Sequence, residues 1–289
     1  MELHHILLTL LAGVGAGGIN AIVGSGTLIT FPALVAFGVP PVTATMSNAV
    51  GLIPGNIASS FGYRTELAGQ KKRMLQLIPA SLLGALTGAY LLLHLPEDAF
   101  ITIVPVLLVL ALLLVIFQPM MQRMLRERSM RSSEGAAPAP AAADPPAAAD
   151  PDGAAAPADA AAAGTAPLSL GRNIVVFIAV YATAVYGGYF AAAQGIILIA
   201  LLALLLPESL QRINGAKNVL VLVVNTVAAS IYVIVGFDRI NWMAAGLIAL
   251  GSLIGGYVGA RVGRKFSPVL LRTVIVILGL VALWNILRL

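Results

Sequence analysis

The stretch Gly17-Gly18-Ile19-Asn20-Ala21-Ile22-Val23-Gly24-Ser25-Gly26-Thr27 decides how this chain folds. It lies between two apolar runs, 5–23 and 26–38. Glycines there interrupt a helix in apolar surroundings, so the freed amides and the hydroxyls of Ser25 and Thr27 need partners. A helix that starts after Gly26 aims the positive end of its dipole at the break. The stretch predicts either an anion site or, as the alternative, close helix packing through small residues.

The composition of the 289 residues indicates a bilayer environment. Hydrophobic residues make up 59% and charged residues 10%, against about 25% charged in soluble domains, and the mean hydropathy is +0.96. A spanning helix needs about 20 apolar residues, and the second segment of each half is shorter than that. We predict an all-α polytopic membrane protein with eight to ten membrane segments, among 5–23, 26–38, 42–62, 74–93, 99–117, 173–190, 195–206, 213–235, 241–260 and 268–287.

Several function classes are disfavoured by residue type. The chain has no cysteine, and its histidines, His4, His5 and His94, lie at segment ends without the spacing of a metal site. It has no Gly-Lys-Ser/Thr motif for nucleotide phosphates. The net charge of +5 comes from basic residues that lie between apolar runs, as membrane topology requires, so we expect no nucleic-acid partner. We expect no enzyme activity, metal or cofactor. The N-terminus lacks a basic n-region, so the first run is expected to be retained.

A segment of different composition divides the chain. Residues 135–167 are almost wholly Ala, Pro, Asp and Gly, with nothing to bury, and we expect disorder there. We therefore predict an N-terminal transmembrane repeat (1–118), a cytoplasmic linker (119–171) and a C-terminal transmembrane repeat (172–289). A docking or regulatory role for the linker is the alternative. Contact with anionic lipid is expected next to the preceding span, at Arg123, Arg126, Arg128 and Arg131.

The two halves resemble each other at three places in the same order. Gly84-Ala85-Leu86-Thr87-Gly88-Ala89-Tyr90 matches Gly251-Ser252-Leu253-Ile254-Gly255-Gly256-Tyr257. Ala44-Thr45-Met46-Ser47-Asn48 corresponds to Asn214-Gly215-Ala216-Lys217-Asn218, and Gly26-Thr27-Leu28-Ile29 to Gly195-Ile196-Ile197-Leu198. An ordered series of this kind indicates two repeats.

The basic loops predict that the repeats are inverted. The first half has its basic loop after the third segment, at Arg64, Lys71, Lys72 and Arg73. The second half has it one segment later, at Arg261, Arg264 and Lys265. Because positive loops stay in the cytoplasm, equivalent helices run in opposite directions. If the short segments cross, both termini lie outside the inner membrane. Secondary carriers use this plan and place their substrate at the repeat interface near the midplane.

The second half offers two further groups of candidate residues. Gln194 falls at a break like that of the first half and has an amide to offer; Tyr186 and Tyr189 are either part of that site or interfacial anchors. Lys217 lies near the start of a long apolar segment, where a charge is costly and suggests a substrate contact. It neutralises a bound anion, gains and loses a proton in this apolar setting, or extends to the headgroups. Asn56 and Asn225 lie deeper in apolar segments, where their side-chain amides need hydrogen-bond partners. Structural hydrogen bonds between helices would suffice for both.

At these residues the chain resembles the TauE/SafE family, whose named members are described as sulfite exporters. The resemblance covers Gly-Xaa-Ile-Asn-Ala-Ile-Val-Gly-Ser-Gly and Phe31-Pro32-Ala33-Leu34 in the first half. In the second it covers Tyr186-Gly187-Gly188-Tyr189-Phe190, Asn214-Gly215-Ala216-Lys217-Asn218 and Gly255-Gly256-Tyr257-Val258-Gly259-Ala260-Arg261. Family members often have glycine where this chain has Ser25, Ala191 and Ala193, which alters the local backbone because alanine takes positive φ less freely. The resemblance implies sulfite, sulfonates or related anions as substrates.

The sequence therefore predicts a carrier with two inverted repeats that exports a small sulfur-containing anion by alternating access, coupled to the proton or ion gradient. A facilitative, channel-like permease for another solute and a membrane scaffold or assembly factor remain the alternatives. The predicted substrate-binding residues are Asn20, Gly24, Ser25, Gly26, Thr27, Asn48, Tyr186, Gln194, Gly195, Asn214, Lys217 and Asn218.

Overall fold

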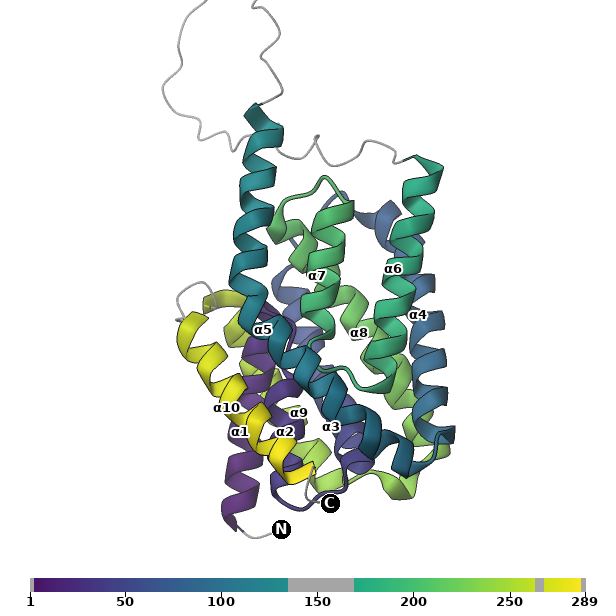
Figure 1. Ribbon diagram of the computed structural model, residues 1–289, viewed down its shortest axis with the longest axis vertical. Coiled ribbons are helices and arrows are strands. Elements are labelled where there is room, and N and C mark those ends of the chain that lie inside the picture. Colours follow the sequence, from purple (N-terminus) through teal and green to yellow (C-terminus); the bar gives the residue numbers. More distant parts are fainter. Residues whose placement is uncertain (1–2, 135–168, 263–267, 287–289) are drawn as a thin grey trace, which may run out of the picture.

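The computed structural model describes residues 3–134, 169–262 and 268–286, and these form helices without any strand (Figure 1). The first half contains α1 (Leu3–Ile22), α2 (Thr27–Ala36), α3 (Pro41–Gly62), α4 (Lys71–His94) and α5 (Glu97–Glu134). The second half contains α6 (Leu170–Tyr189), α7 (Gln194–Leu205), α8 (Leu210–Val235), the 3-10 turn η2 (Phe237–Arg239), α9 (Trp242–Val262) and α10 (Pro268–Ile286).

The length and apolarity of the helices confirm an all-helical, multi-pass membrane protein. Six helices in the described ranges are long and apolar enough to cross a bilayer: α1, α4, α5, α6, α8 and α9. The eight to ten segments expected include short ones, and Thr27–Ala36, Gln194–Leu205 and Ile275–Trp284 are apolar but shorter than these six. α3 has 22 residues but includes polar, buried positions such as Asn48 and Asn56. α2 and α7 have 10 and 12 residues, as short as the sequence predicts.

The fifth helix extends beyond the boundary predicted at residue 118. α5 continues through Pro119 to Glu134 and so includes the Arg123–Arg131 cluster. The residues after Pro119 are mostly Met, Gln, Arg, Leu and Glu, which are good helix formers and favour continuation. The start of the segment expected to be a linker is therefore helical. Its Ala/Pro-rich part, 135–168, lies outside the described residues.

The packing of the helices exchanges elements between the two halves. α9 packs against α1 and α3, while α4 packs against α6 and α8. Each bundle thus combines the first three helices of one half with the fourth helix of the other. Four further pairs also join the two halves: α2 with α10, α7 with α5, α3 with α8, and α5 with α10. When the halves are exchanged, the α2–α10 pair maps onto α7–α5, and the α3–α8 and α5–α10 pairs map onto themselves, as expected for two repeats.

Two pairs of helices at corresponding places in the halves, α1 with α6 and α5 with α10, run in opposite directions in Figure 1. In Figure 1, α1 begins and α10 ends at the lower end of the molecule, whereas α5 ends and α6 begins at the upper end. α3 joins α4 through a basic segment that contains Arg64 and is followed by Lys71 and Lys72. α4 begins, α5 ends and α6 begins toward this upper end, and the sequence is basic at each of these three places.

Glycines allow the tightest helix contacts. On α9, a Cβ added to Gly251 would lie 2.8 Å from the Val14 backbone nitrogen of α1. A Cβ on Gly17 of α1 would lie 2.7 Å from the Ser252 Cα. On the other bundle, a Cβ on Gly84 of α4 would come within 2.6 Å of the Ala184 Cβ of α6. Small residues at membrane helix interfaces serve this close approach.

Replacing Gly251 with alanine should therefore destabilise the protein. Backbone of α1 opposes the new methyl group and cannot move aside as a flexible side chain can, so overpacking should cost about 1–3 kcal/mol. Thermal unfolding of purified protein in detergent micelles measures the effect. Gly246→Ala is the matched control on the same helix, because an added Cβ there meets nothing within 4 Å. Equal unfolding temperatures for the two variants would contradict the tight α1–α9 contact.

Candidate functional site

The first helix break is present where the sequence predicts it. α1 ends at Ile22, α2 begins at Thr27, and Gly24 adopts a φ of +83°. This left-handed conformation is accessible to glycine without a steric penalty. Ser25 and Thr27 are both buried, so the break lies inside the protein and away from the surrounding lipid.

The second break has the same form but is built from alanines. α6 ends at Tyr189 and α7 begins at Gln194. Between them Ala191 and Ala193 have φ values of 63° and 58°. A left-handed conformation costs an L-residue about 1–2 kcal/mol, and such strain persists only where the surroundings impose it. Both alanines adopt the left-handed conformation that glycine takes more freely.

Two tyrosine hydroxyls hold this second break in place. The hydroxyl of Tyr186 donates a hydrogen bond to the Ala192 carbonyl, and the hydroxyl of Tyr232 on α8 donates to the Gly188 carbonyl. Both bonds satisfy backbone oxygens that the interruption leaves without a helical partner. Tyr186 thus acts on the break itself and is not an exposed interfacial anchor.

The two breaks touch each other in the interior. The Gly195 amide donates to the Gly24 carbonyl oxygen at 2.9 Å. A Cβ on Gly24 would lie 2.5 Å from the Gly195 Cα and 3.2 Å from Lys217 Cδ. Glycine is required at both positions because the backbones meet directly. The crossing also places the side chain of Lys217 beside the first break.

Lys217 is completely buried, with 0% of its surface exposed. Its ammonium donates to the Asn20 carbonyl oxygen at 2.8 Å and to that of Ala21 at 3.5 Å. These carbonyls form the C-terminal end of α1, the negative end of its dipole, where a cation is stabilised. The side-chain amides of Asn214 and Asn218, which lie on α8 as Lys217 does, donate to the Ala21 carbonyl oxygen at 3.3 and 3.4 Å. The ammonium therefore does not extend to the headgroups.

The charge of Lys217 has no carboxylate partner among the described residues. The acidic side chains there belong to helix ends, to connecting segments and to the C-terminal part of α5. Glu208, in the segment before α8, pairs with Arg73 at 2.5 Å and with Arg212 at 2.7 Å. Backbone carbonyl dipoles alone therefore compensate the buried cation. A buried charge without a counter-ion is costly, so this arrangement favours a negatively charged ligand.

Asn20 connects Lys217 to the first break. Its Nδ2 donates to Asn56 Oδ1 of α3 at 2.5 Å, and its Oδ1 accepts from the Gly26 amide at 3.4 Å. Its own carbonyl accepts from Lys217. Within the described part of the chain, Ser25 Oγ and Asn56 Nδ2 are buried and have no hydrogen-bond partner. These are donors, and buried polar groups without partners normally indicate a missing ligand or water.

The remaining predicted residues form a separate cluster or lie apart from Lys217. Asn48 donates to Thr27 Oγ1 at 3.1 Å and accepts from Thr30 Oγ1, so it joins α3 to α2. Gln194 is buried, and its amide group lies against Gly187 of α6. The structure therefore brings together seven of the predicted residues: Asn20, Gly24, Gly26, Gly195, Asn214, Lys217 and Asn218. Thr27 and Asn48 adjoin this group through α2.

Asn56 is the main residue that sequence reasoning assigns differently. It is expected only to make structural bonds between helices, and it does bond to Asn20, yet its Nδ2 is left without a partner. Thr30 and Tyr232 also contact the breaks and are not among the predicted residues. A lone polar residue in an apolar segment is the only sequence signal for any of them.

The chain matches the model of one known protein family over residues 9–285, which is nearly its entire length. The chain belongs to the sulfite exporter TauE/SafE family. The family match includes both helix breaks and the α8 residues around Lys217. It confirms the resemblance noted in the sequence.

Individual relatives are named as probable membrane transporter proteins. One from Haemophilus influenzae is 23% identical over 281 residues, which cover 96% of this chain and 94% of the relative. ORF9 of Sinorhizobium sp. is 29% identical over 38% of this chain, and YfcA of Escherichia coli K12 is 29% identical over 40%. These matches span 42% and 43% of those two relatives. No solved structure matches the chain.

The strained alanine at 193 gives a test of the second break. Ala193→Gly should leave the free energy of unfolding unchanged or raise it slightly, because relief of about 1–2 kcal/mol of strain opposes the added chain entropy. Ala192→Gly is the control: it is equally buried and has no positive φ, so it should lose about 1 kcal/mol. Denaturation in detergent micelles compares them. A larger loss for Ala193→Gly than for Ala192→Gly would contradict the observed backbone.

Proposed function

We propose that this protein is a secondary transporter that exports a small sulfur-containing anion, sulfite or an organosulfonate, across the inner membrane. The family it belongs to is described as sulfite exporters, and its relatives are named as probable membrane transporter proteins. The observation that carries the proposal is the buried ammonium of Lys217 on the carbonyl of Asn20, whose side chain bonds to Asn56. Two buried donors without partners, Ser25 Oγ and Asn56 Nδ2, belong to the same helix break and to the Asn20–Asn56 pair.

The chemistry of this cluster suits an oxyanion. The ammonium of Lys217 has three hydrogens to donate, and the hydroxyl of Ser25 and the amide of Asn56 add neutral donors. α2 begins next to the cluster and directs the positive end of its dipole toward the break. Sulfite and sulfonate groups offer several acceptor oxygens and negative charge to such donors. A cationic substrate would meet an ammonium without a nearby carboxylate.

The helix arrangement supports transport by alternating access. The breaks of the two halves meet where Gly195 of the second half donates to Gly24 of the first half. Helices from both halves therefore surround the contact. We interpret the halves as inverted repeats, a plan in which two mirrored conformations open the site to opposite sides. The basic end of the bundle faces the cytoplasm in this proposal, which places the segment after α5 inside the cell. Export would be coupled to the proton or ion gradient.

Lys217 should be essential for transport. Met is of similar length and apolar, so Lys217→Met removes the charge without leaving a large cavity. Purified wild-type protein in proteoliposomes should take up radiolabelled sulfite under an imposed pH gradient, and the variant should lose this uptake. Lys72→Met is the matched control, since Lys72 is exposed at the start of α4.

Size-exclusion profiles in detergent verify that both variants remain folded. Uptake by Lys217→Met at the wild-type rate would remove Lys217 from the site. Uptake by the wild type without any dependence on the gradient would indicate a facilitative permease instead. An absence of uptake by correctly inserted wild-type protein would reject sulfite, and the same assay would then be run with organosulfonates.

Ser25 provides a second test, aimed at substrate contact. A hydrogen bond to a charged group contributes about 1.5–3 kcal/mol, so Ser25→Ala should raise the KM for the anion at least about 10-fold. Ser59→Ala is the matched control: Ser59 is equally buried, but its hydroxyl donates to the Gly55 carbonyl of its own helix at 2.8 Å. Concentration dependence of uptake gives both values. An unchanged KM for Ser25→Ala would exclude its hydroxyl from binding.

A further inference from the structure

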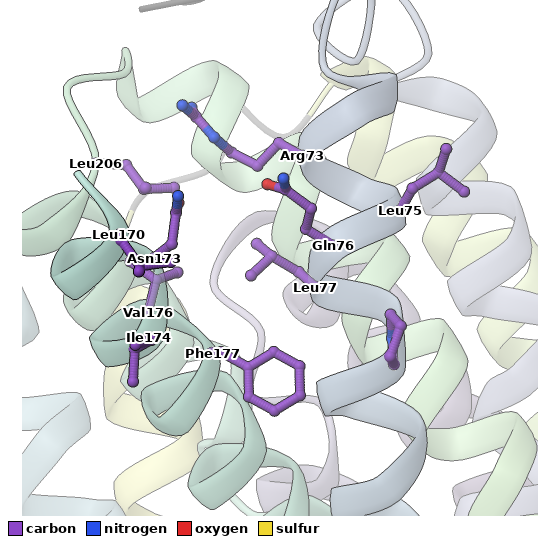
Figure 2. A pocket seen from close by; sticks show the side chains of 11 residues that line it. Arg73, Leu75, Gln76, Leu77, Leu170, Asn173, Ile174, Val176, Phe177 and Leu206 are labelled. Atoms are coloured by element: carbon purple, nitrogen blue, oxygen red, sulfur yellow. The ribbon is translucent and has the colours of Figure 1, made fainter. Parts of the chain in front are cut away.

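A pocket outside the central cluster opens between α4 and α6. It has a volume of about 380 Å³, which is within the usual range for ligand sites. Figure 2 shows Gln76 and Leu77 of α4 facing Asn173 and Phe177 of α6 across it. The two helices pack closely through Gly84, Gly88 and Gly188 farther along, so the pocket lies where they separate toward their N-terminal ends.

The polar side chains of the lining lie toward the N-terminal ends of α4 and α6, together with Leu75 and Leu170. Arg73, Gln76 and Asn173 lie within the first two turns of their helices. Deeper in the pocket the lining consists of apolar side chains, including Leu77, Pro79, Val176 and Phe177. From Arg73 to Pro79 the helix rises by about 9 Å. A phospholipid at the membrane surface has the same order, with a polar headgroup above an acyl chain.

The rim of the pocket carries excess positive charge. Arg73 and Arg212 share a single carboxylate, that of Glu208. Arg172 lies next to the lining residues Leu206 and Asn173, because its Nε donates to the Leu205 carbonyl at 2.7 Å. Lys71 and Lys72, which immediately precede Arg73 at the start of α4, are exposed. Basic pockets between membrane helices near the surface bind anionic lipid headgroups.

The pocket is separated from the proposed anion site. A cluster of buried apolar residues fills the space between α4, α6, α7 and α8, and Leu77, Val176 and Leu206 belong both to this cluster and to the pocket wall. Ala216 and Leu220, on either side of Lys217 in sequence, belong to the same cluster. A desolvated inorganic anion would find no polar path through it. The pocket opens instead toward the outside of the helix bundle, where Leu75 and Ile174 are 63% and 51% exposed.

We propose that this pocket binds one anionic phospholipid. An acyl chain lies against Leu77 and Phe177, and the headgroup phosphate lies near Arg73 and Arg172. The site is independent of the transport function proposed above, because it neither contacts nor opens onto Lys217.

Native mass spectrometry of the detergent-purified protein with added lipid tests the site. The wild type should retain phosphatidylglycerol in preference to phosphatidylcholine. Ile174→Trp fills the pocket from its wall and should abolish retention of phosphatidylglycerol. Val175→Trp is the matched control, since Val175 is 50% exposed on the same helix and does not line the pocket. The control should bind as the wild type does.

A charge variant tests the headgroup contact separately. Arg73→Gln should lower the affinity for phosphatidylglycerol about fivefold, as expected for one basic residue near the surface, and should remove the preference over phosphatidylcholine. Equal retention of the two lipids by the wild type would overturn the proposal. Equal behaviour of the two Trp variants, or an undiminished preference in Arg73→Gln, would also overturn it. None of these outcomes depends on whether sulfite is transported.

Discussion

The direct backbone contact between Gly24 and Gly195 is the constraint on which the rest of the structure depends. The Gly195 amide donates to the Gly24 carbonyl, and neither position has room for a side chain. Both halves of the chain must therefore interrupt a helix at this contact. The interruptions produce the short α2 and α7 and turn the first residues of these helices toward the interior. The left-handed conformations of Gly24 and Ala193 are equivalent parts of this crossing, one in each half.

The crossing creates an electrostatic problem that a ligand can solve. Lys217 is held beside Gly24 with its ammonium on the last carbonyls of α1, and partial charges of a helix end offset only part of a full charge in a dry interior. Ser25 Oγ, in the first break, and Asn56 Nδ2, on the residue that bonds to the Asn20 side chain, are buried donors without partners. An anion bound here would compete with the Asn20 carbonyl for the ammonium. Substrate binding would thus weaken a contact between α8 and α1 that helps to hold the two repeats together.

Residue patterns predict the main features of the fold but not its exceptions. The long apolar runs predict the spanning helices, and the glycines predict the first break, because their physical causes are local. The continuation of α5 past Pro119 depends on helix formers that follow it, and the positive φ of Ala191 and Ala193 opposes the preference of alanine. The exchange of α4 and α9 between bundles and the open donor of Asn56 arise from tertiary packing. No short motif encodes either of them.

A structure determined with selenite would locate the anion directly, because selenite is an analogue of sulfite and its selenium atom can be found by anomalous scattering. We expect one selenium whose oxygens lie within hydrogen-bonding reach of Lys217 Nζ and Ser25 Oγ, with the ammonium drawn away from the Asn20 carbonyl. Selenium located elsewhere in the protein, with Lys217 still bound to the end of α1, would contradict the central claim that this buried cation binds the transported anion.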